Sequence, residues 1–377
     1  MHICLVTSEY NGPSKNGGIG TAFRYLSRFL VKEGHQVTVL YASRAPFIAE
    51  TLNRWVTQLA SENIVFIPLM QQLPRFPLRP PQDHVEMGFH IYQWLKEHTF
   101  DAIHFHDYQG LGYHSLKAKS QGIAFADTTL YVQLHGPSLW VEEQNRDYLD
   151  NIETVATFFQ ERESIALADC LISPSHYMLE WCRKQGWVLP ETITVLPNLY
   201  ESSPQPLPLS GTYRDTRFFP SELVFFGRLE QRKGLELFCR AVARLPAALM
   251  EGKTITFLGT PKPYAEAMIA RWCNGLRYRI LPGYSQEEAI GYLQSANALA
   301  IIPSLDENFP YTVLECLIEG IPLLASQVGG IPEMISPADR AECLFHPEAD
   351  ALTEKLSYAL TQGVKRVPCA VDITAVQ

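Results

Sequence analysis

The chain has 377 residues, with 31 Lys and Arg against 40 Asp and Glu, so its formal charge at pH 7 is −9. That balance excludes a protein that binds nucleic acid through a generally cationic surface. Hydrophobic residues make up 46% of the chain and charged residues 19%, which is typical of a folded globular protein. The length favours two domains, since single hydrophobic cores stop growing beyond roughly 250 to 300 residues.

No targeting or membrane segment is visible in the sequence. The first ten residues, MHICLVTSEY, lack the pattern of a signal peptide. The longest apolar run, Ala296 to Pro303, is far shorter than the roughly 18 residues that cross a bilayer. The eight cysteines are scattered and form no C-x-x-C pair, so we interpret them as buried thiols in a reducing compartment. We therefore expect a cytoplasmic protein without stable membrane insertion.

In the first half of the chain, short apolar runs alternate with longer amphipathic stretches, which indicates β-α-β units and a parallel sheet. Helices are predicted at Thr21–Lys32, ending at Gly34, and at Asn151–Ala168. The predicted strands are Ile3–Ser8, Gln36–Tyr41, Ala102–Phe105, Thr129–Leu134, Cys170–Ser173 and Thr192–Leu196.

A proline-rich stretch from Glu201 to Pro220 favours an extended connector. We expect a first domain over residues 1–203, a linker over 204–220 and a second domain over 221–377. The strands predicted in the second domain are Leu223–Phe226, Thr254–Leu258, Tyr278–Leu281, Ala298–Ile302 and Pro322–Ala325. Its predicted helices are Leu235–Arg244, Tyr264–Trp272, Gln286–Ala296, Tyr311–Glu319 and Ala349–Thr361.

The predicted fold class is α/β, with two Rossmann-like, doubly wound parallel-sheet domains. Ligands in such sheets bind beyond the carboxyl ends of the strands, so we expect the active site in a cleft between the domains. A second proline-rich stretch, Leu73 to Gln82, is either a surface loop or a loop that faces an acceptor.

A glycine cluster, Gly17-Gly18-Ile19-Gly20, follows the first predicted strand and opens the first helix. Glycines allow close approach of the backbone to a ligand, and the N–H groups of a helix N-terminus favour an anion such as a diphosphate. The dinucleotide-binding spacing G-x-G-x-x-G is absent, which disfavours NAD. A simple turn is an equally ordinary interpretation of such a cluster.

Two cations, Arg228 and Lys233, follow the strand LVFF. A leaving diphosphate develops negative charge, and a bidentate Arg with a Lys point charge would stabilise its departure. The alternative is a solvated basic turn.

Two glutamates, Glu307 and Glu315, stand eight residues apart, one in a loop and one about a turn into an apolar helix. That spacing suits two hydroxyl clusters on one elongated ligand, because a carboxylate accepts hydrogen bonds from vicinal hydroxyls. The alternative is an acid at the helix N-terminus followed by a surface acid. The apolar neighbours of Glu315 favour the first interpretation. The later Gly329-Gly330 pair begins a tight turn before Glu333.

These motifs, in this order and over nearly the whole chain, resemble the group-1, family 4 glycosyltransferases with the GT-B fold. The segments that carry the resemblance are GGIG, QLHG with His135, GRLEQRKG, PSLDENFPYTVLE and GGIPE.

The resemblance implies a retaining enzyme that moves a sugar from a nucleotide-diphosphate donor of UDP or GDP type to a saccharide, lipid-linked or small-molecule acceptor. It implies no metal and no other cofactor, and the sequence holds no D-x-D pair. It places Gly17 and Gly18 along the diphosphate, and Glu307 and Glu315 on the donor sugar and the ribose respectively. Arg228 and Lys233 would neutralise the diphosphate, and His135 would reach the sugar near its reacting carbon.

The chain departs from the family pattern in two places. Pro310 stands where many members have glycine and has no N–H to donate. Hydrogen bonds to the nucleotide sugar would then come from Asn308, Phe309, Tyr311 or Thr312. A final helix that crosses back onto the first domain is expected to be very short or absent, unless the chain is one part of a longer polypeptide.

Two other functions remain open from the sequence: a GT-B nucleotide-sugar epimerase, and a non-catalytic partner of another transferase. Residues 1–205 carry 15 basic and 21 acidic side chains, so we do not expect stable binding to an anionic membrane. A role in cell-surface polysaccharide or glycoconjugate synthesis is expected, while the donor base, the sugar and the acceptor are left undefined.

Overall fold

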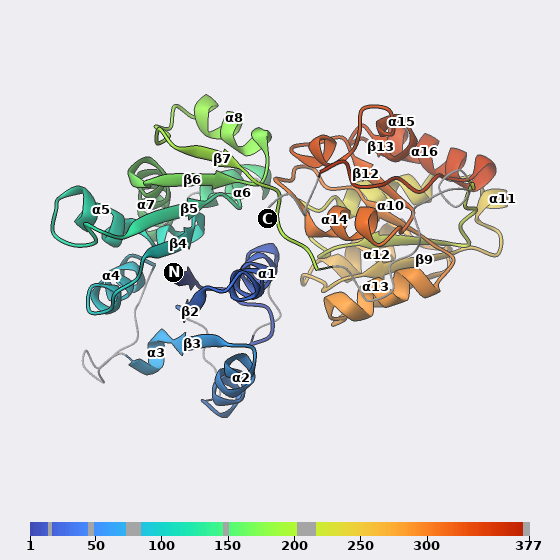
Figure 1. Ribbon diagram of the computed structural model, residues 1–377. Helices are drawn as coiled ribbons and strands as arrows, with labels where there is room; N and C mark the ends of the chain where they lie inside the picture. Colours follow the sequence, from blue (N-terminus) through green and yellow to red (C-terminus); the bar gives the residue numbers. More distant parts are fainter. Residues whose placement is uncertain (14–16, 44–48, 73–83, 146–150, 202–215, 372–377) are drawn as a thin grey trace. The chain divides into compact units, whose positions relative to one another are not determined.

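The computed structural model describes residues 1–13, 17–43, 49–72, 84–145, 151–201 and 216–371 (Figure 1). The chain divides into two compact units, Met1–Leu199 and Tyr200–Gln377. Most of the expected linker and the proline-rich stretch Leu73–Gln82 lie outside the described residues.

The first unit is built on a seven-stranded parallel sheet with strand order β3-β2-β1-β4-β5-β6-β7. The strands are β1 (His2–Thr7), β2 (Gln36–Tyr41), β3 (Ile64–Pro68), β4 (Ala102–His106), β5 (Thr129–Gln133), β6 (Cys170–Ser173) and β7 (Ile193–Val195). The helices are α1 (Gly18–Lys32), α2 (Ala49–Ser61), α3 (Leu69–Gln72), α4 (His84–Leu95), η1 (Tyr108–Gly110), α5 (Tyr113–Ser120), α6 (Ser138–Asn145), α7 (Ile152–Leu167) and α8 (His176–Lys184).

The second unit is built on a six-stranded parallel sheet with strand order β10-β9-β8-β11-β12-β13. The strands are β8 (Glu222–Phe226), β9 (Thr254–Leu258), β10 (Tyr278–Leu281), β11 (Ala298–Ile302), β12 (Leu323–Ser326) and β13 (Leu344–Phe345). The helices are α10 (Leu235–Ala243), α11 (Ala247–Met250), α12 (Ala265–Trp272), α13 (Gln286–Ser295), α14 (Tyr311–Ile318), η2 (Ile331–Met334), α15 (Arg340–Cys343) and α16 (Ala349–Gln362).

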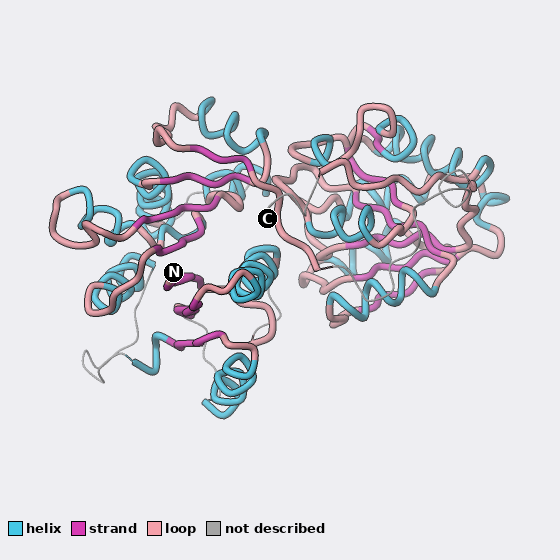
Figure 2. The backbone as a smooth tube through the Cα atoms, viewed as in Figure 1, coloured by secondary structure: helices cyan, strands magenta, loops and turns pink. Residues whose placement is uncertain are grey.

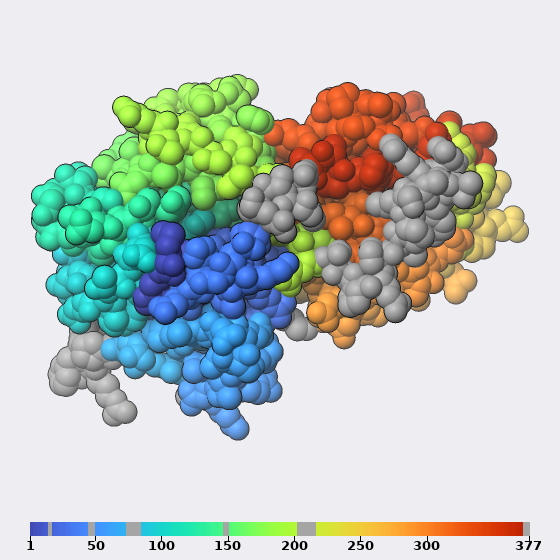
Figure 3. All heavy atoms as spheres, in the orientation of Figure 1, coloured from blue at the N-terminus to red at the C-terminus, as the bar shows by residue number. Residues whose placement is uncertain are grey.

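Each sheet is buried in the middle of its unit, and helices lie on both sides of the strands (Figure 2). The central strands are buried and mostly apolar, because both faces of a parallel sheet are covered, although β4 also carries the buried His104 and His106. In the second unit, Phe225 and Phe257 on neighbouring strands pack against Phe238 of α10. In the space-filling view, the atoms of each unit are closely packed over the face that is visible (Figure 3). In both sheets the strand order reverses beside the first strand, which is the topology expected from the sequence.

The structure confirms all eleven predicted strands, and it adds two at the sheet edges, β3 and β13. The prediction that the first helix begins at Thr21 is wrong by three residues, because α1 starts at Gly18 and its first turn contains glycines that carry no apolar pattern. All eight cysteines are free thiols, but Cys170 and Cys369 are only partly buried, so full burial was wrong for these two. Within the described ranges, no helix has both the length and the apolar character needed to span a bilayer.

Two glycines allow the loops at the carboxyl end of the second sheet to pack closely. Gly234 has a φ of +75°, and a Cβ atom there would lie 1.8 Å from the carbonyl oxygen of Pro303. Gly329 has a φ of +52°, and its Cβ would lie 1.9 Å from the carbonyl oxygen of Glu307. Any other residue would push these loops apart. The glycines therefore hold the loop after β8 and the turn after β12 against the loop after β11.

Replacement of Gly234 by alanine should destabilise the second unit far more than the matched change Gly252→Ala. Both glycines have a φ near +70°, but nothing lies within 4 Å of the position of a Cβ at Gly252. We expect a loss of about 1 kcal/mol for Gly252→Ala and of at least about 3 kcal/mol for Gly234→Ala. Urea unfolding followed by circular dichroism measures both losses. Equal losses would contradict the proposed backbone contact with Pro303.

Candidate functional site

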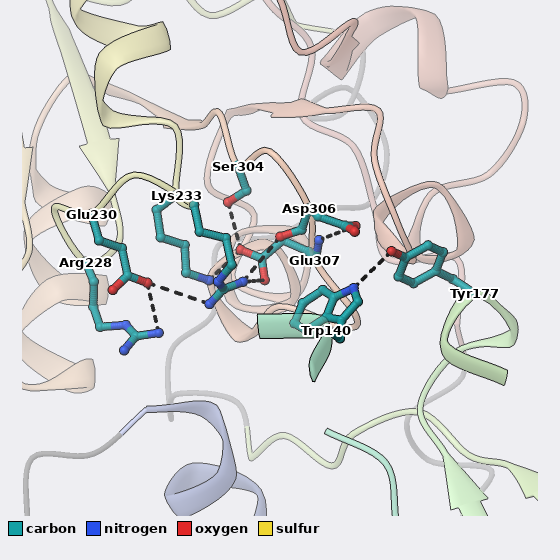
Figure 4. A network of polar contacts seen from close by, with 9 residues as sticks. Trp140, Tyr177, Arg228, Glu230, Lys233, Ser304, Asp306 and Glu307 are labelled. Atoms are coloured by element: carbon teal, nitrogen blue, oxygen red, sulfur yellow. Dashed lines mark hydrogen bonds and ion pairs between the residues drawn. The ribbon is translucent and has the colours of Figure 1, made fainter. Parts of the chain in front are cut away.

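The centre of the candidate site in the second unit is the buried carboxylate of Glu307, in the loop between β11 and α14. Ser304 Oγ donates a hydrogen bond to Glu307 Oε1 at 2.7 Å, and Lys233 Nζ forms an ion pair with the same oxygen. Arg232 Nη1 lies 3.4 Å from Glu307 Oε2. Figure 4 shows the Ser304, Lys233 and Glu307 side chains converging. The predicted Lys233 and Glu307 therefore lie in direct contact.

The backbone holds this loop in place. Glu307 N donates to Asp306 Oδ1 at 2.8 Å, and Leu305 N donates to the carbonyl oxygen of Arg232 at 2.8 Å. Gly330 N donates to the carbonyl oxygen of Glu307 at 2.9 Å. The loops after β8, β11 and β12 thus share one hydrogen-bonded arrangement at the carboxyl edge of the sheet. The GGIPE motif, left as a tight turn by the sequence, supplies one of these contacts.

The charges of this cluster are set by burial and by pairing. Burial opposes ionisation of Glu307, but the charges of Lys233 and Arg232 outweigh it and bring the pKa of this carboxyl to about 2. Burial lowers the pKa of Lys233 to about 8, while Glu307 acts in the opposite direction. Both groups are therefore largely ionised at neutral pH. An ionised carboxylate accepts hydrogen bonds and donates none, which suits contact with hydroxyl groups.

Arg228 lies on the exposed side of this cluster, and 54% of its side chain is accessible to solvent. Its Nη2 is 3.0 Å from Glu230 Oε1, and the same oxygen is 3.7 Å from Arg232 Nη2. Arg232, Glu230 and Ser304 were missed by the sequence analysis. The signal for Arg232 is its position beside Lys233 in the run QRKG, whereas Ser304 is distinguished only by its spacing of three residues from Glu307.

Glu315 lies on α14 in a different environment. It is buried, and its Oε1 accepts a hydrogen bond from Gln286 Nε2 at 2.6 Å. Burial raises the pKa of Glu315 to about 7. Glu307 and Glu315 thus have separate partners and opposite pKa shifts, as expected for groups that do not act as a close carboxylate pair. Contact of Glu315 with a ribose stays a prediction.

The segment between the two glutamates forms the start of α14. Pro310 is the N-cap, and its carbonyl oxygen accepts from the backbone of Val313 and Leu314. The residues proposed as hydrogen-bond donors around the proline differ in exposure: Asn308, Phe309 and Tyr311 are buried, and Thr312 is partly exposed. Contact of these residues with a nucleotide sugar stays a prediction.

In the first unit, His135 follows β5, and its ring lies 6.1 Å from that of Phe23 on α1. The predicted Gly17 and Gly18 form the N-terminus of the same helix and are exposed. His135 Nε2 is buried and has no hydrogen-bond partner in the part of the chain that the structure describes. Burial, with smaller effects of His106 and His104, holds the pKa of His135 well below its usual range. The imidazole is therefore neutral.

Two buried carboxyl groups hold the turn that carries His135. Asp107 accepts hydrogen bonds from the backbone of His135, Gly136 and Tyr108 at 2.9, 3.0 and 2.9 Å. Glu161 accepts from Ser138 N and Gln109 N, both at 2.7 Å. Neither was identified from the sequence, although Asp107 directly follows the strand that ends in HFH.

Trp140 completes this turn. A Cβ atom on Gly136 would lie 2.9 Å from the indole ring, and Trp140 Nε1 donates to Tyr177 Oη at 3.1 Å (Figure 4). The backbone of the His135 turn is therefore fixed from both sides while the ring nitrogen keeps its free hydrogen-bonding capacity.

Comparison with known proteins identifies the class. Residues 16–202 match the model described as Glycosyltransferase Family 4, and residues 220–362 match that of Glycosyl transferases group 1. The two parallel-sheet units are those of a GT-B glycosyltransferase. The chain belongs to the group 1, family 4 glycosyltransferases, as the sequence motifs predict, and it is a glycosyltransferase.

Relatives span most of the chain. A glycogen synthase of Mycobacterium tuberculosis is 28% identical over 354 residues, which are 89% of this chain and 80% of the relative. The MMP alpha-(1->4)-mannosyltransferase of Mycolicibacterium hassiacum is 26% identical over 96% of this chain and 89% of its own length.

Solved structures agree with this fold. Sucrose-phosphate synthase of Thermosynechococcus elongatus has a TM-score of 0.70 at 19% identity, covering 95% of this chain and 89% of its own. Anabaena HepE in complex with UDP-glucose has a TM-score of 0.62 at 18% identity, covering 96% and 90%.

Replacement of Glu315 by glutamine should stabilise the protein at pH 8 and leave its stability unchanged at pH 4. With a folded pKa near 7, above its ordinary value of 4.5, Glu315 keeps its proton in the folded state where the unfolded chain has lost it. The free energy of unfolding of the wild type therefore falls between pH 4.5 and 7. Glutamine removes this loss, which is about 1 to 3 kcal/mol.

Urea unfolding at both pH values measures this difference, with Glu266→Gln, an exposed acid on α12, as the control. A variant that is less stable than the wild type at pH 8 would show that the ionised carboxylate is satisfied in the fold and that burial is not the dominant effect.

Proposed function

We propose that this glycosyltransferase uses a nucleoside diphosphate sugar of UDP or GDP type, retains the anomeric configuration and requires no metal ion. The observation that carries the proposal is the cluster of Arg232, Lys233 and Glu307, with Arg228 at its exposed side. Three cations at the carboxyl edge of a parallel sheet suit a diphosphate. They supply positive charge close to the leaving group.

In the proposed reaction, the bond between the anomeric carbon and the diphosphate oxygen breaks, and the acceptor hydroxyl forms the new bond on the same face. The hydroxyl proton passes to the departing phosphate. Lys233, Arg228 and Arg232 stabilise the negative charge that develops on the leaving group. Glu307, ionised and held by Lys233, accepts hydrogen bonds from sugar hydroxyls.

We assign no covalent enzyme intermediate. Glu307 is neutralised by two cations, and Glu315 on α14 is hydrogen-bonded to Gln286 on α13. A retaining glycosidase, in contrast, places two carboxyl groups about 5 to 5.5 Å apart around the reacting bond. In the first unit, the neutral His135 would offer its unpartnered Nε2 to a hydroxyl of the donor sugar.

The relatives support a saccharide product. They include a glycogen synthase and a mannosyltransferase, and the structure of HepE is that of a complex with UDP-glucose. We infer an acceptor that is a glycan, a lipid-linked saccharide or a small molecule, and a place in polysaccharide or glycoconjugate synthesis.

Incubation with UDP, GDP and ADP sugars, with and without saccharide acceptors and in the presence of EDTA, tests the proposal. The wild type should transfer or hydrolyse at least one donor, and proton NMR of the product should show the anomeric configuration of the donor. Glu307→Gln should lose about 100-fold or more in kcat. The exposed Glu348→Gln serves as the matched control and should keep full activity.

Circular dichroism must show that Glu307→Gln is folded, because it leaves Lys233 without its buried partner. Loss of all activity in EDTA with recovery on adding a divalent cation would contradict metal independence. An inverted product would contradict retention, and a changed sugar without any acceptor would indicate an epimerase.

A further inference from the structure

The carboxylate of Glu230 lies between two guanidinium groups at the exposed side of the cation cluster. Its Oε1 is 3.0 Å from Arg228 Nη2 and 3.7 Å from Arg232 Nη2. Only 12% of the Glu230 side chain is accessible to solvent, against 54% for Arg228. Glu230 is thus held inside the site, whereas one of its two partners can be reached by a ligand.

Glu230 and Glu307 neutralise the cation cluster in different places. Glu307 contacts Lys233 and Arg232 and is itself held by Ser304 and by the backbone of its loop. Glu230 contacts Arg232 and Arg228. The three cations and the two carboxylates that pair with them have a net charge of about +1 as a group of five side chains, which is less than a diphosphate requires.

A carboxylate and a phosphate bind guanidinium groups in the same way, through charge-assisted hydrogen bonds to oxygen. An oxygen that lies between the Nη2 atoms of Arg228 and Arg232 takes a position suited to a phosphate oxygen. Two anions at one position repel each other, and the repulsion is strong where solvent screening is weak.

We propose that Glu230 is an internal counter-anion of the donor site, which holds Arg228 and Arg232 in the absence of donor and competes with a diphosphate for them. Glu230 then lowers the affinity of the site for diphosphates, including the nucleoside diphosphate product. The weaker binding of the nucleoside diphosphate product makes its release faster. This inference rests on the proposed function in one respect, namely that the natural ligand is a nucleoside diphosphate.

Calorimetric titration of the full chain with inorganic pyrophosphate tests the competition directly. Glu230→Gln should bind pyrophosphate about threefold to tenfold more tightly than the wild type, since it keeps the shape of the side chain and removes its charge. The matched control is Glu236→Gln, which removes an acid on α10 that pairs with Arg240 outside the cluster. It should leave the affinity unchanged.

An unchanged or weaker affinity in Glu230→Gln overturns the proposal, because a weaker affinity would mean that Glu230 mainly preorganises the two arginines. Circular dichroism checks the fold. If Glu230→Gln does not fold, Glu230→Asp moves the carboxylate away from the guanidinium groups by one methylene and should give an intermediate increase in affinity. A weaker or unchanged affinity of Glu230→Asp for pyrophosphate would also overturn the proposal.

Titration with UDP and GDP separates this inference from the proposed function. Glu230→Gln can tighten pyrophosphate binding while neither the wild type nor the variant binds a nucleoside diphosphate. That result would contradict the proposed donor class and would support the role of Glu230 as a counter-anion. If the wild type turns over a nucleotide sugar, KM for the donor should fall in Glu230→Gln while kcat does not rise. Equal KM values would overturn the role of Glu230 in donor binding.

Discussion

The candidate site depends on neutralisation of one buried carboxylate. An ionised carboxyl group inside a protein is costly unless cations and hydrogen-bond donors surround it. Glu307 meets this requirement only if Lys233 and Arg232, more than 70 residues earlier in the chain, reach it from the loop after β8. That contact in turn needs Gly234 to lie against the backbone of Pro303, where a residue with a Cβ atom does not fit. The charge pair and the glycine therefore form one constraint.

The two units organise the carboxyl edges of their sheets with different groups. In the second unit, cations of the β8 loop surround the carboxylate of Glu307. In the first unit, the carboxyl groups of Asp107 and Glu161 accept backbone N–H groups from the turns after β4 and β5. The cluster in the second unit presents the exposed Arg228 to an anionic ligand, whereas the carboxyl groups in the first unit hold backbone N–H groups and the Ser138 hydroxyl. This difference supports the placement of the diphosphate on the second unit.

The fold was predictable from the sequence because a parallel sheet covered on both faces requires continuous apolar strands. The edge strand β3 was missed although its sequence, IVFIP, is apolar throughout; in the structure its Val65 is exposed to solvent. β13 has only two residues, too few for any pattern. Lys233 and Glu307 were recognised from motifs, but their contact was not, because it depends on a tertiary approach of two loops. Arg232, Ser304, Asp107 and Glu161 were missed for the same reason, because their contacts also form only when separate loops come together in the fold.

The two glutamates of the segment from Ser304 to Glu315 show why spacing alone could not define their roles. Glu307 is held ionised by Lys233 and Arg232, so it acts only as an acceptor. Glu315, with Gln286 as its hydrogen-bond partner and no cation among the groups that shift its pKa, remains close to the point where it exchanges a proton near neutral pH. A ligand hydroxyl can therefore only donate to the first, whereas it can donate to or accept from the second. Environment, and not residue type, makes the pair suited to different parts of one elongated ligand.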